Sequence, residues 1–339
     1  MCYANYIYSS YSNTTYRYNL STFRSKNKIR WRITMNNLAR FNLAKQVKLY
    51  ITKGIQDILR LNSKLKIGML ILLVISALAI LEPVINQAIL GPISPITPGI
   101  FKPLLKPSRE HLLGTDLLGR DLLALSLHGL KYSFLIGIVA GFLSSFIGIV
   151  IGFISGYKGG IYDSILRTIT DFMIIIPTWP ILAILATYIK FMRIEGLAMI
   201  LAIFTWPLSA RIIRGQVLSL KERPYVDLAK VTNLSDFEII FLELMPNILP
   251  YIGVGIGNSV IGAVLAETGL EVIGLGPGNI VTLGTLLNWA LGFGAVIMGN
   301  WNILIAPVLF LISIFLSFNL VNVGLDEIYN PRLKKVTGE

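Results

Sequence analysis

Long blocks of apolar residues constrain the fold of this chain more than any other feature of its sequence. Several blocks approach the length of about 20 residues that a helix needs to cross the hydrocarbon core of a bilayer. Only 14% of the residues are charged, compared with about a quarter in soluble domains. The sequence therefore predicts an all-α integral membrane protein with six transmembrane helices, at about 67–86, 133–155, 170–189, 196–213, 248–268 and 301–322.

The net charge of +12 is concentrated before the first apolar block. Residues 1–66 contain 13 Lys and Arg side chains and a single acid, Asp57, whereas the other 273 residues contain 17 basic and 17 acidic side chains. A basic flank is typical of a segment that stays in the cytoplasm beside anionic lipid. With the N-terminus inside, the inner segments hold 23 Lys and Arg and the outer segments hold 7. Both termini are therefore predicted to be cytoplasmic.

The basic tail is interpreted as a partner of the lipid bilayer, not of nucleic acid. Within residues 1–66, the stretch 37–65 mixes Leu and Ile with Lys and Arg, which is typical of an interfacial amphipathic helix. A solvated basic tail is the alternative for the first half of that stretch. No platform of interleaved basic and aromatic residues accompanies the charge, and this argues against nucleic-acid binding.

Residues suited to catalysis or metal binding are scarce. Cys2 is the only cysteine, and His111 and His128 are the only histidines, so neither a disulfide nor a metal site is expected. The sequence contains no Gly-Lys-Ser or Gly-Lys-Thr, and hence no P-loop. The chain is therefore expected to be no enzyme and to hold no cofactor, and any ATP hydrolysis would come from a partner.

Glycines recur along the second predicted span, mostly at intervals of four residues, and two more lie in the fifth span. Small residues at this spacing let helix backbones approach closely in a membrane. The pattern fits either packing inside one bundle or an interface between subunits. The residues are Gly137, Gly141, Gly148, Gly152 and Gly156, with Gly253 and Gly257.

A polar segment precedes the second span, in the predicted extracytoplasmic loop 87–132. It reads His-Leu-Leu-Gly-Thr-Asp-Leu-Leu-Gly-Arg-Asp over 111–121. Its glycines indicate a tight turn, and an acid at its end is suited to start a helix. A structural cap is one interpretation, and a site facing the pore or the outside is the other. The candidate residues are Asp116, Arg120 and Asp121.

A cytoplasmic elbow is predicted at 214–247, between the fourth and fifth spans. Residues 225–232 are suited to a short helix, and Asn233 can adopt the left-handed conformation that ends it. Ser235 or Asp236 can then cap a second helix.

Pro246 and Pro250 are predicted to stop that second helix before the fifth span. An elbow of this kind suits a rigid lever that docks into another protein, whereas a plain connecting loop would not need so many caps. The candidate residues are Tyr225, Asp227, Leu228, Ala229, Asn233, Ser235, Asp236, Ile239, Ile240 and Pro246.

Glu267 is the ionisable residue placed deepest in a predicted span. Acids inside a membrane are candidates for function because burying their charge is costly. No Lys or Arg partner is evident in the sequence, and Glu267 lies near the outer end of the span. We therefore treat it as a pore-side candidate.

These segments together resemble the permeases of binding-protein-dependent ABC importers, specifically the C-type subunit of the oligopeptide/dipeptide family. The similarity rests on the 111–121 motif, on Gly-Tyr-Lys-Gly-Gly at 156–160, on the elbow and on the closing pattern from Phe318 to Leu333. It covers about 111–335. Two departures from the family pattern fall in the elbow, where Asp-Leu-Ala at 227–229 replaces Glu-Ala-Ala and Asn233 replaces Gly.

The resemblance implies a mechanism and a set of partners. A permease core at 133–325, with the first span peripheral to its five helices, would form a pore with a B-type permease in the cell membrane. Two P-loop ATPases would bind below, with residues 225–241 as the coupling helix, and a substrate-binding protein would dock outside. A cytoplasmic C-terminus would follow at 326–339. The family implies short peptides as cargo, and related systems move oligosaccharides or metal chelates.

Other classes of membrane protein fit the sequence less well. An ion-coupled secondary transporter or a channel would usually show ionisable pairs at the bilayer midplane and repeated halves. Glu267 and Asp171 lie in or near the spans without forming such a pair, and no repeat is found. A membrane enzyme would need a cluster of catalytic side chains, and a scaffold would not explain the capped elbow.

Overall fold

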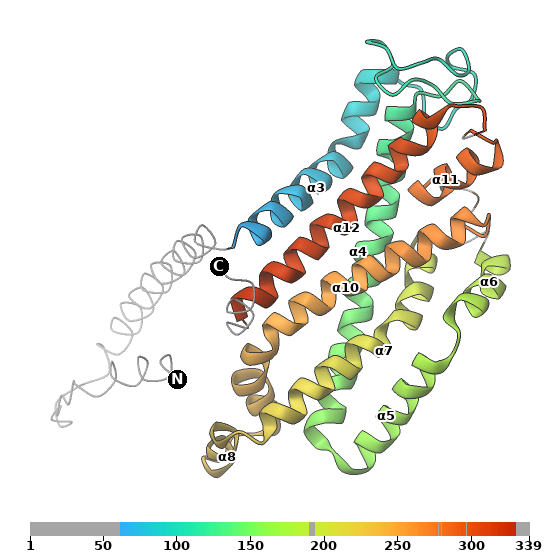
Figure 1. Ribbon diagram of the computed structural model, residues 1–339. Helices are drawn as coiled ribbons and strands as arrows, with labels where there is room; N and C mark the ends of the chain where they lie inside the picture. The colour runs from blue at the N-terminus through green and yellow to red at the C-terminus, as the bar shows by residue number, and fades with distance from the viewer. Residues whose placement is uncertain (1–61, 190–193, 277, 279, 296, 330–339) are drawn as a thin grey trace, which may run out of the picture. The chain divides into compact units, whose positions relative to one another are not determined.

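The structure is a computed structural model that describes residues 62–189, 194–276, 278, 280–295 and 297–329. Most of the predicted amphipathic helix and most of the predicted C-terminal segment fall outside these ranges. All regular elements within them are helices (Figure 1). They are α3 (Ser63–Leu90), α4 (Leu122–Lys158), α5 (Gly160–Ile175), α6 (Thr178–Ile189), α7 (Ile194–Lys221), α8 (Pro224–Val231), α9 (Asp236–Glu238), the π-helical η1 (Ile239–Leu244), α10 (Met245–Val272), α11 (Leu283–Gly292) and α12 (Trp301–Tyr329).

Five helical stretches in the described residues are long and apolar enough to cross a membrane. They are α3, α4, α7, the continuous stretch Asp236–Val272 and α12. Each contains one of the predicted spans, which confirms the all-α membrane fold. Helix α4 begins well before the predicted span because Asp121 caps it. With 37 residues it is about 55 Å long, so it extends beyond a hydrocarbon core of about 30 Å.

The predicted span at 170–189 is broken into two helices. The chain forms α5 and α6 there, and the two helices are bent by 76° relative to each other. Pro177 lies between them, where it cannot donate a backbone hydrogen bond and forces the preceding residue out of the helical region. Ile176 accordingly adopts φ −60° and ψ 127°. Hydropathy gave no sign of this break.

The glycines of α4 pack inside the bundle. A Cβ on Gly141 would lie 2.7 Å from the Val260 Cα of α10, and one on Gly152 would lie 2.8 Å from the Ala210 carbonyl oxygen of α7. The backbones therefore approach too closely for any side chain. Gly137 lies against the Val264 side chain of α10, and Gly148 and Gly156 meet α7. Of the two interpretations of the glycine pattern, packing inside the bundle applies to all five.

Helix α3 packs against α12 and α4. Gly68 of α3 lies against the backbone of α12, since a Cβ there would be 2.9 Å from the Ser317 carbonyl oxygen. Glu82 of α3 is buried and contacts two side chains of α4. Its carboxylate lies 2.9 Å from His128 Nδ1 and 2.9 Å from Lys131 Nζ. Ionic contacts therefore add to apolar packing at this helix pair.

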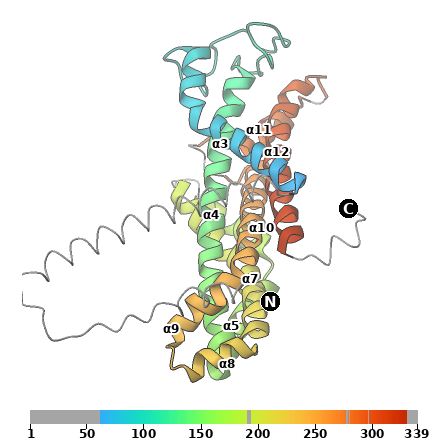
Figure 2. The same cartoon turned by 90° about the vertical axis from the view of Figure 1, so that its left-hand side faces the viewer.

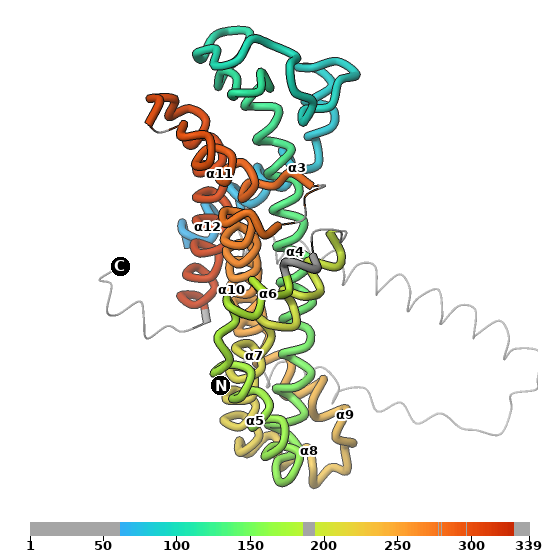
Figure 3. The backbone as a smooth tube through the Cα atoms, turned by 90° about the vertical axis from the view of Figure 1, so that its right-hand side faces the viewer, coloured from blue at the N-terminus to red at the C-terminus, as the bar shows by residue number. Residues whose placement is uncertain are grey.

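The segment from α9 to α10 is one continuous helical stretch, which corrects the expectation that Pro246 and Pro250 stop a helix. Pro246 lies in the first turn of α10 and Pro250 lies inside it. The wider π-helical turn of η1 directly precedes Pro246, and adjustments of this kind accommodate prolines in membrane helices. Figures 2 and 3 show that the elbow and the loop between α3 and α4 lie at opposite ends of the long helices.

Candidate functional site

The elbow connects α7 to α10, and its turn follows the predicted local geometry. Asn233 has φ 63°, in the left-handed region. Its N–H donates to the Lys230 carbonyl oxygen at 3.1 Å, and the Leu234 N–H donates to the Ala229 carbonyl oxygen at 3.2 Å. This pair of bonds is the Schellman motif, which satisfies the last carbonyls of a helix. The prediction for Asn233 is confirmed.

Ser235, not Asp236, caps the second helix of the elbow. The Ser235 Oγ accepts from the Glu238 N–H at 3.3 Å, and the Glu238 carboxylate accepts from the Ser235 N–H at 2.8 Å. This reciprocal arrangement is a capping box. Asp236 instead accepts a hydrogen bond of 2.9 Å from the Tyr157 hydroxyl at the end of α4.

One side of the elbow is buried against the long helices. Val226 and Ala229 of α8 and Ile239 of η1 belong to an apolar cluster with residues of α4, α7 and α10, and Ile240 packs at its edge. The Tyr225 hydroxyl is also buried, without a hydrogen-bond partner among the described residues, and burial raises its pKa. Ala229 is only 4% exposed, so this small residue packs inside the chain.

The other side of the elbow is exposed and carries large apolar side chains among polar ones. Leu228 is 65% exposed and Val231 is 83% exposed. Asp227 is also exposed and lies 3.3 Å from Lys230 Nζ. Large apolar side chains gathered on a surface indicate a contact with another molecule. We call the following exposed residues the elbow patch: Leu228, Val231, Phe237, Phe241 and Leu242.

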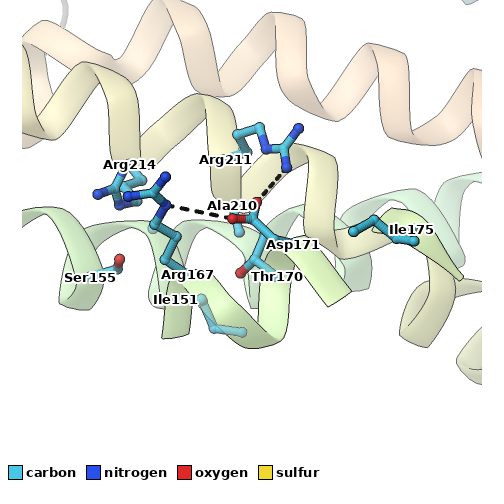
Figure 4. A pocket seen from close by; sticks show the side chains of 10 residues that line it. Ile151, Ser155, Arg167, Thr170, Asp171, Ile175, Ala210, Arg211 and Arg214 are labelled. Carbon is cyan, nitrogen blue, oxygen red and sulfur yellow. Dashed lines mark hydrogen bonds and ion pairs between the residues drawn. The ribbon is translucent and has the colours of Figure 1, made fainter. Parts of the chain in front are cut away.

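A charged cavity of about 510 Å³ lies between α4, α5 and α7. Figure 4 shows Asp171 of α5 between Arg211 of α7 and Arg167, with which it forms ion pairs. Arg214 of α7 donates two hydrogen bonds of 2.6 Å to Asp163 of α5. Two groups of ion pairs therefore join α5 to α7, and the charged residues in the lining of the cavity are three arginines and Asp171.

The three polar candidates of the outer loop are buried and satisfied inside the fold. Asp121 accepts from two backbone N–H groups in the first turn of α4, at 3.0 and 2.9 Å, and its carboxylate also lies 2.8 Å from His111 Nδ1. Arg120 donates to Asp116 at 2.7 Å and stacks 4.1 Å from the ring centre of Trp289. These contacts hold the loop to the start of α4, as a structural cap would.

Glu267 is completely buried near the end of α10. Its two oxygens accept from the Ser133 hydroxyl of α4 at 3.3 and 3.2 Å. Glu271 lies one turn further along and accepts from the hydroxyls of Thr282 and Thr285 at the start of α11. Neither carboxylate forms an ion pair with a described residue. The two acids join α10 to α4 and α11 through hydroxyl groups.

A comparison with protein families shows which family this chain belongs to. Residues 148–335 match the family described as binding-protein-dependent transport system inner membrane component. That stretch covers more than half of the chain. The chain belongs to this family. The inner membrane component is a multi-pass protein of the cytoplasmic membrane, and the matched residues include the charged cavity, the elbow and α10 through α12.

Relatives of this inner membrane component confirm the resemblance to C-type peptide permeases. The oligopeptide transport system permease protein OppC of Mycobacterium tuberculosis (strain ATCC 25618 / H37Rv) is 34% identical over 235 residues, which is 68% of this chain and 79% of that protein. The dipeptide transport system permease protein DppC of Bacillus subtilis (strain 168) is 30% identical over 278 residues, 82% of this chain and 84% of that protein.

A solved structure is also similar to the inner membrane component. A chain of the MetNI methionine ABC transporter, in inward facing conformations, aligns with a TM-score of 0.45 and 16% identity. The alignment covers 61% of this chain and 95% of that chain.

Three residues of the inner membrane component that form the contacts described above were not predicted from the sequence. Tyr157 lay in the Gly-Tyr-Lys-Gly-Gly motif, but its bond to Asp236 joins positions 79 apart, and no local pattern signals such a contact. Glu82 lies within the predicted first span, and an acid inside a span indicates a candidate for function. Glu271 follows Glu267 by four residues, a spacing that places both on one helix face.

Proposed function

We propose that this inner membrane component is one of two permease subunits of an ATP-driven importer and that its elbow docks into an ATPase. The elbow patch is the observation that carries this proposal. The turn of the elbow is closed by a Schellman motif and a capping box, and its inner side is packed, yet it exposes large apolar side chains. A rigid support with an exposed apolar surface suits a docking site.

The packing of the elbow suggests how movement would be transmitted. Val226, Ala229 and Ile239 share one buried cluster with side chains of α4, α7 and α10. Because packed side chains resist deformation, a displacement of α8 would move the ends of these helices together. Closure of two P-loop ATPases on ATP would then shift the pore between inward- and outward-facing states.

The remaining partners follow from the family. A homologous B-type permease would complete the pore, and an extracytoplasmic substrate-binding protein would deliver cargo at the end that carries the loop between α3 and α4. The names of the relatives specify oligopeptide and dipeptide transport. We therefore propose di- and oligopeptides as cargo, or similar small solutes such as oligosaccharides.

The first test is purification of the tagged subunit from gently solubilised membranes, followed by identification of its partners and their stoichiometry. Recovery with a second permease and P-loop ATPases is the expected result. Recovery of the chain alone, or only with copies of itself, would instead favour an ion-coupled transporter or a channel and would contradict the proposal.

Variants of the elbow make the test specific to the docking surface. Leu228→Asp and Val231→Asp should keep the subunit in the membrane but remove the ATPases from the purified complex. Glu222→Gln, at an exposed position just before α8, is the matched control and should retain them. Asp227→Lys tests the exposed charge in the same assay and should weaken ATPase recovery.

Ala229→Trp tests the buried side of the elbow. Because Ala229 is packed inside this chain, the larger side chain should displace α8 and reduce both elbow order and uptake. The rate of protease cleavage within residues 224–238 measures the loss of elbow order. Uptake that stays normal with both Leu228→Asp and Ala229→Trp would exclude the elbow as the coupling element.

A further inference from the structure

A second cavity, of about 300 Å³, lies at the break between α5 and α6 and is also lined by α7 and α10. Asn258 lines it from the midpoint of α10. The cavity therefore lies about halfway along α10. Its volume is at the lower end of the range for small-ligand pockets, about 300–1,000 Å³.

The polar groups of this cavity are all uncharged. Thr178 contributes from α6, Thr205 and Ser209 from α7, and Asn258 and Ser259 from α10. No Asp, Glu, Lys, Arg or His is among its lining residues, all of which the structure describes. The cavity can therefore form hydrogen bonds, but it offers no counter-ion to a charged group.

Part of this hydrogen-bonding capacity is unused within the described chain. Asn322 donates to the Asn258 Oδ1 at 2.9 Å, and no described residue accepts from the Asn258 amide group. The hydroxyls of Ser209 and Ser259 lie 3.0 Å apart, and both residues are buried. Since each hydroxyl carries one hydrogen and the pair uses one, a second hydrogen stays free to donate.

Two glycines of α10 leave room in the cavity. A Cβ on Gly255 or on Gly262 would meet no atom within 4 Å, and both residues line the cavity. Gly257 behaves differently, because a Cβ there would lie 2.2 Å from Asn322 Oδ1. Packing within this chain thus explains why position 257 is a glycine, but it does not explain the glycines at 255 and 262.

Between Tyr251 and Leu265, the exposed face of α10 carries no large apolar side chain, unlike the exposed faces of the outer helices. Gly255, Asn258 and Gly262 follow one another at helical spacing, and Asn258 is exposed. The exposed faces of α3 and α12 instead carry large apolar side chains such as Leu70 and Leu309, as expected beside lipid. A polar group facing hydrocarbon is costly, so the α10 face is suited to a polar occupant.

The helix break adds backbone groups to the same place. A break in a membrane helix frees carbonyl groups at the end of one half and N–H groups at the start of the other. Such groups are tolerated at membrane depth where they line a cavity. Here the break at Ile176 and Pro177 is adjacent to the lining residue Thr178.

We propose that this cavity is a subsite of the translocation path that binds the main-chain amides of a peptide cargo; the inference rests on the proposed importer function. A peptide bond carries one neutral donor and one neutral acceptor, which match the uncharged groups of the lining. The apolar remainder of the cavity tolerates different side chains. The subsite therefore recognises the peptide backbone and is indifferent to side-chain charge.

Cysteine labelling in the assembled transporter tests the location of the path. Because Cys2 is the only cysteine, a Cys2→Ser chain supplies a cysteine-free background. Asn258→Cys and Gly262→Cys should react with a charged methanethiosulfonate reagent, and a mixture of di-, tri- and tetra-alanine should slow the reaction. The controls Leu70→Cys and Leu309→Cys, on the exposed apolar faces of α3 and α12, should not react.

Uptake measurements test the recognition chemistry. Asn258→Leu should lower the rate of peptide uptake by about twofold to tenfold, as expected for one neutral hydrogen bond. The loss should be equal for peptides with acidic, basic and apolar side chains, and Asn258→Gln should restore part of the rate. A loss that depends on cargo charge would overturn backbone recognition.

Two outcomes separate failure of the subsite from failure of the proposed function. Cysteines at 258 and 262 that resist the reagent, or that cross-link to the second permease while uptake stays normal, would overturn the subsite and leave the importer intact. Absence of alanine-peptide uptake by the parent complex, together with absence of ATPase partners, would overturn the proposed function itself.

Discussion

The Tyr157 hydroxyl donates a hydrogen bond of 2.9 Å to the Asp236 carboxylate, and so joins the last turn of α4 to the helical stretch that follows the elbow turn. Lys221 at the end of α7 donates to the Gly156 carbonyl oxygen at 3.0 Å, next to Tyr157. The end of α4 is thus linked to both sides of the elbow. Movement of the elbow should therefore be transmitted to α4 through these bonds as well as through apolar packing.

Tyr157→Phe should weaken transmission without unfolding the subunit. The bond is solvent-exposed, so its loss should cost no more than about 0.5–1.5 kcal/mol of stability. We expect more ATP hydrolysed per peptide imported, measured in vesicles that contain the whole complex. Tyr162→Phe, at a nearby exposed tyrosine, is the control. Equal ratios of hydrolysis to import in the two variants would exclude this role of Tyr157.

Asn233 should tolerate glycine and reject β-branched residues. Its left-handed conformation costs a typical side chain about 1–2 kcal/mol, whereas glycine adopts it freely. Asn233→Gly should leave elbow order and uptake unchanged, and Asn233→Val should reduce both. Hydrogen exchange of the backbone amides in α8 measures the order. Faster exchange in the glycine variant than in the valine variant would contradict the geometry.

Gly148 should not accept even a methyl group. A Cβ at this position would lie 2.6 Å from the Ser209 Cβ and 2.9 Å from the Ala210 backbone nitrogen, and overpacking of this kind costs about 1–3 kcal/mol. Gly148→Ala should lower the midpoint of thermal unfolding in detergent. Gly215→Ala in α7, where a Cβ would meet no atom within 4 Å, is the matched control and should not lower it.

Asp121 should act mainly through its cap on α4. Asp121→Ala removes the acceptor for two backbone N–H groups and should destabilise the subunit by about 0.5–2 kcal/mol. Asp121→Asn retains an acceptor oxygen and should recover most of that loss. Thermal unfolding of the purified subunit measures the difference. Equal stability of the alanine variant and the parent would show that the cap is dispensable.

The sequence alone determined those features that depend on neighbouring residues. Hydropathy identified five continuous membrane helices because the cost of exposing polar backbone in lipid selects long apolar helices. The left-handed Asn233 and a cap at Ser235 or Asp236 were predicted because a helix end and a helix cap involve residues only a few positions apart. The family signatures could be recognised in the sequence for the same reason, since they are short and contiguous.

Only the tertiary structure decided which side chains meet and which faces remain exposed. Ala229 proved to be buried in its own chain while Leu228 is exposed, a distinction set by where α8 packs and not by its composition. Tyr157 meets Asp236, and Glu267 meets Ser133, across separations that no local pattern encodes. The open space beside Gly255 and Gly262 belongs to a cavity that is also lined by Thr178, next to the bend at Pro177. The sequence did not reveal this bend, because averaged hydropathy is insensitive to the backbone hydrogen bond that one proline removes.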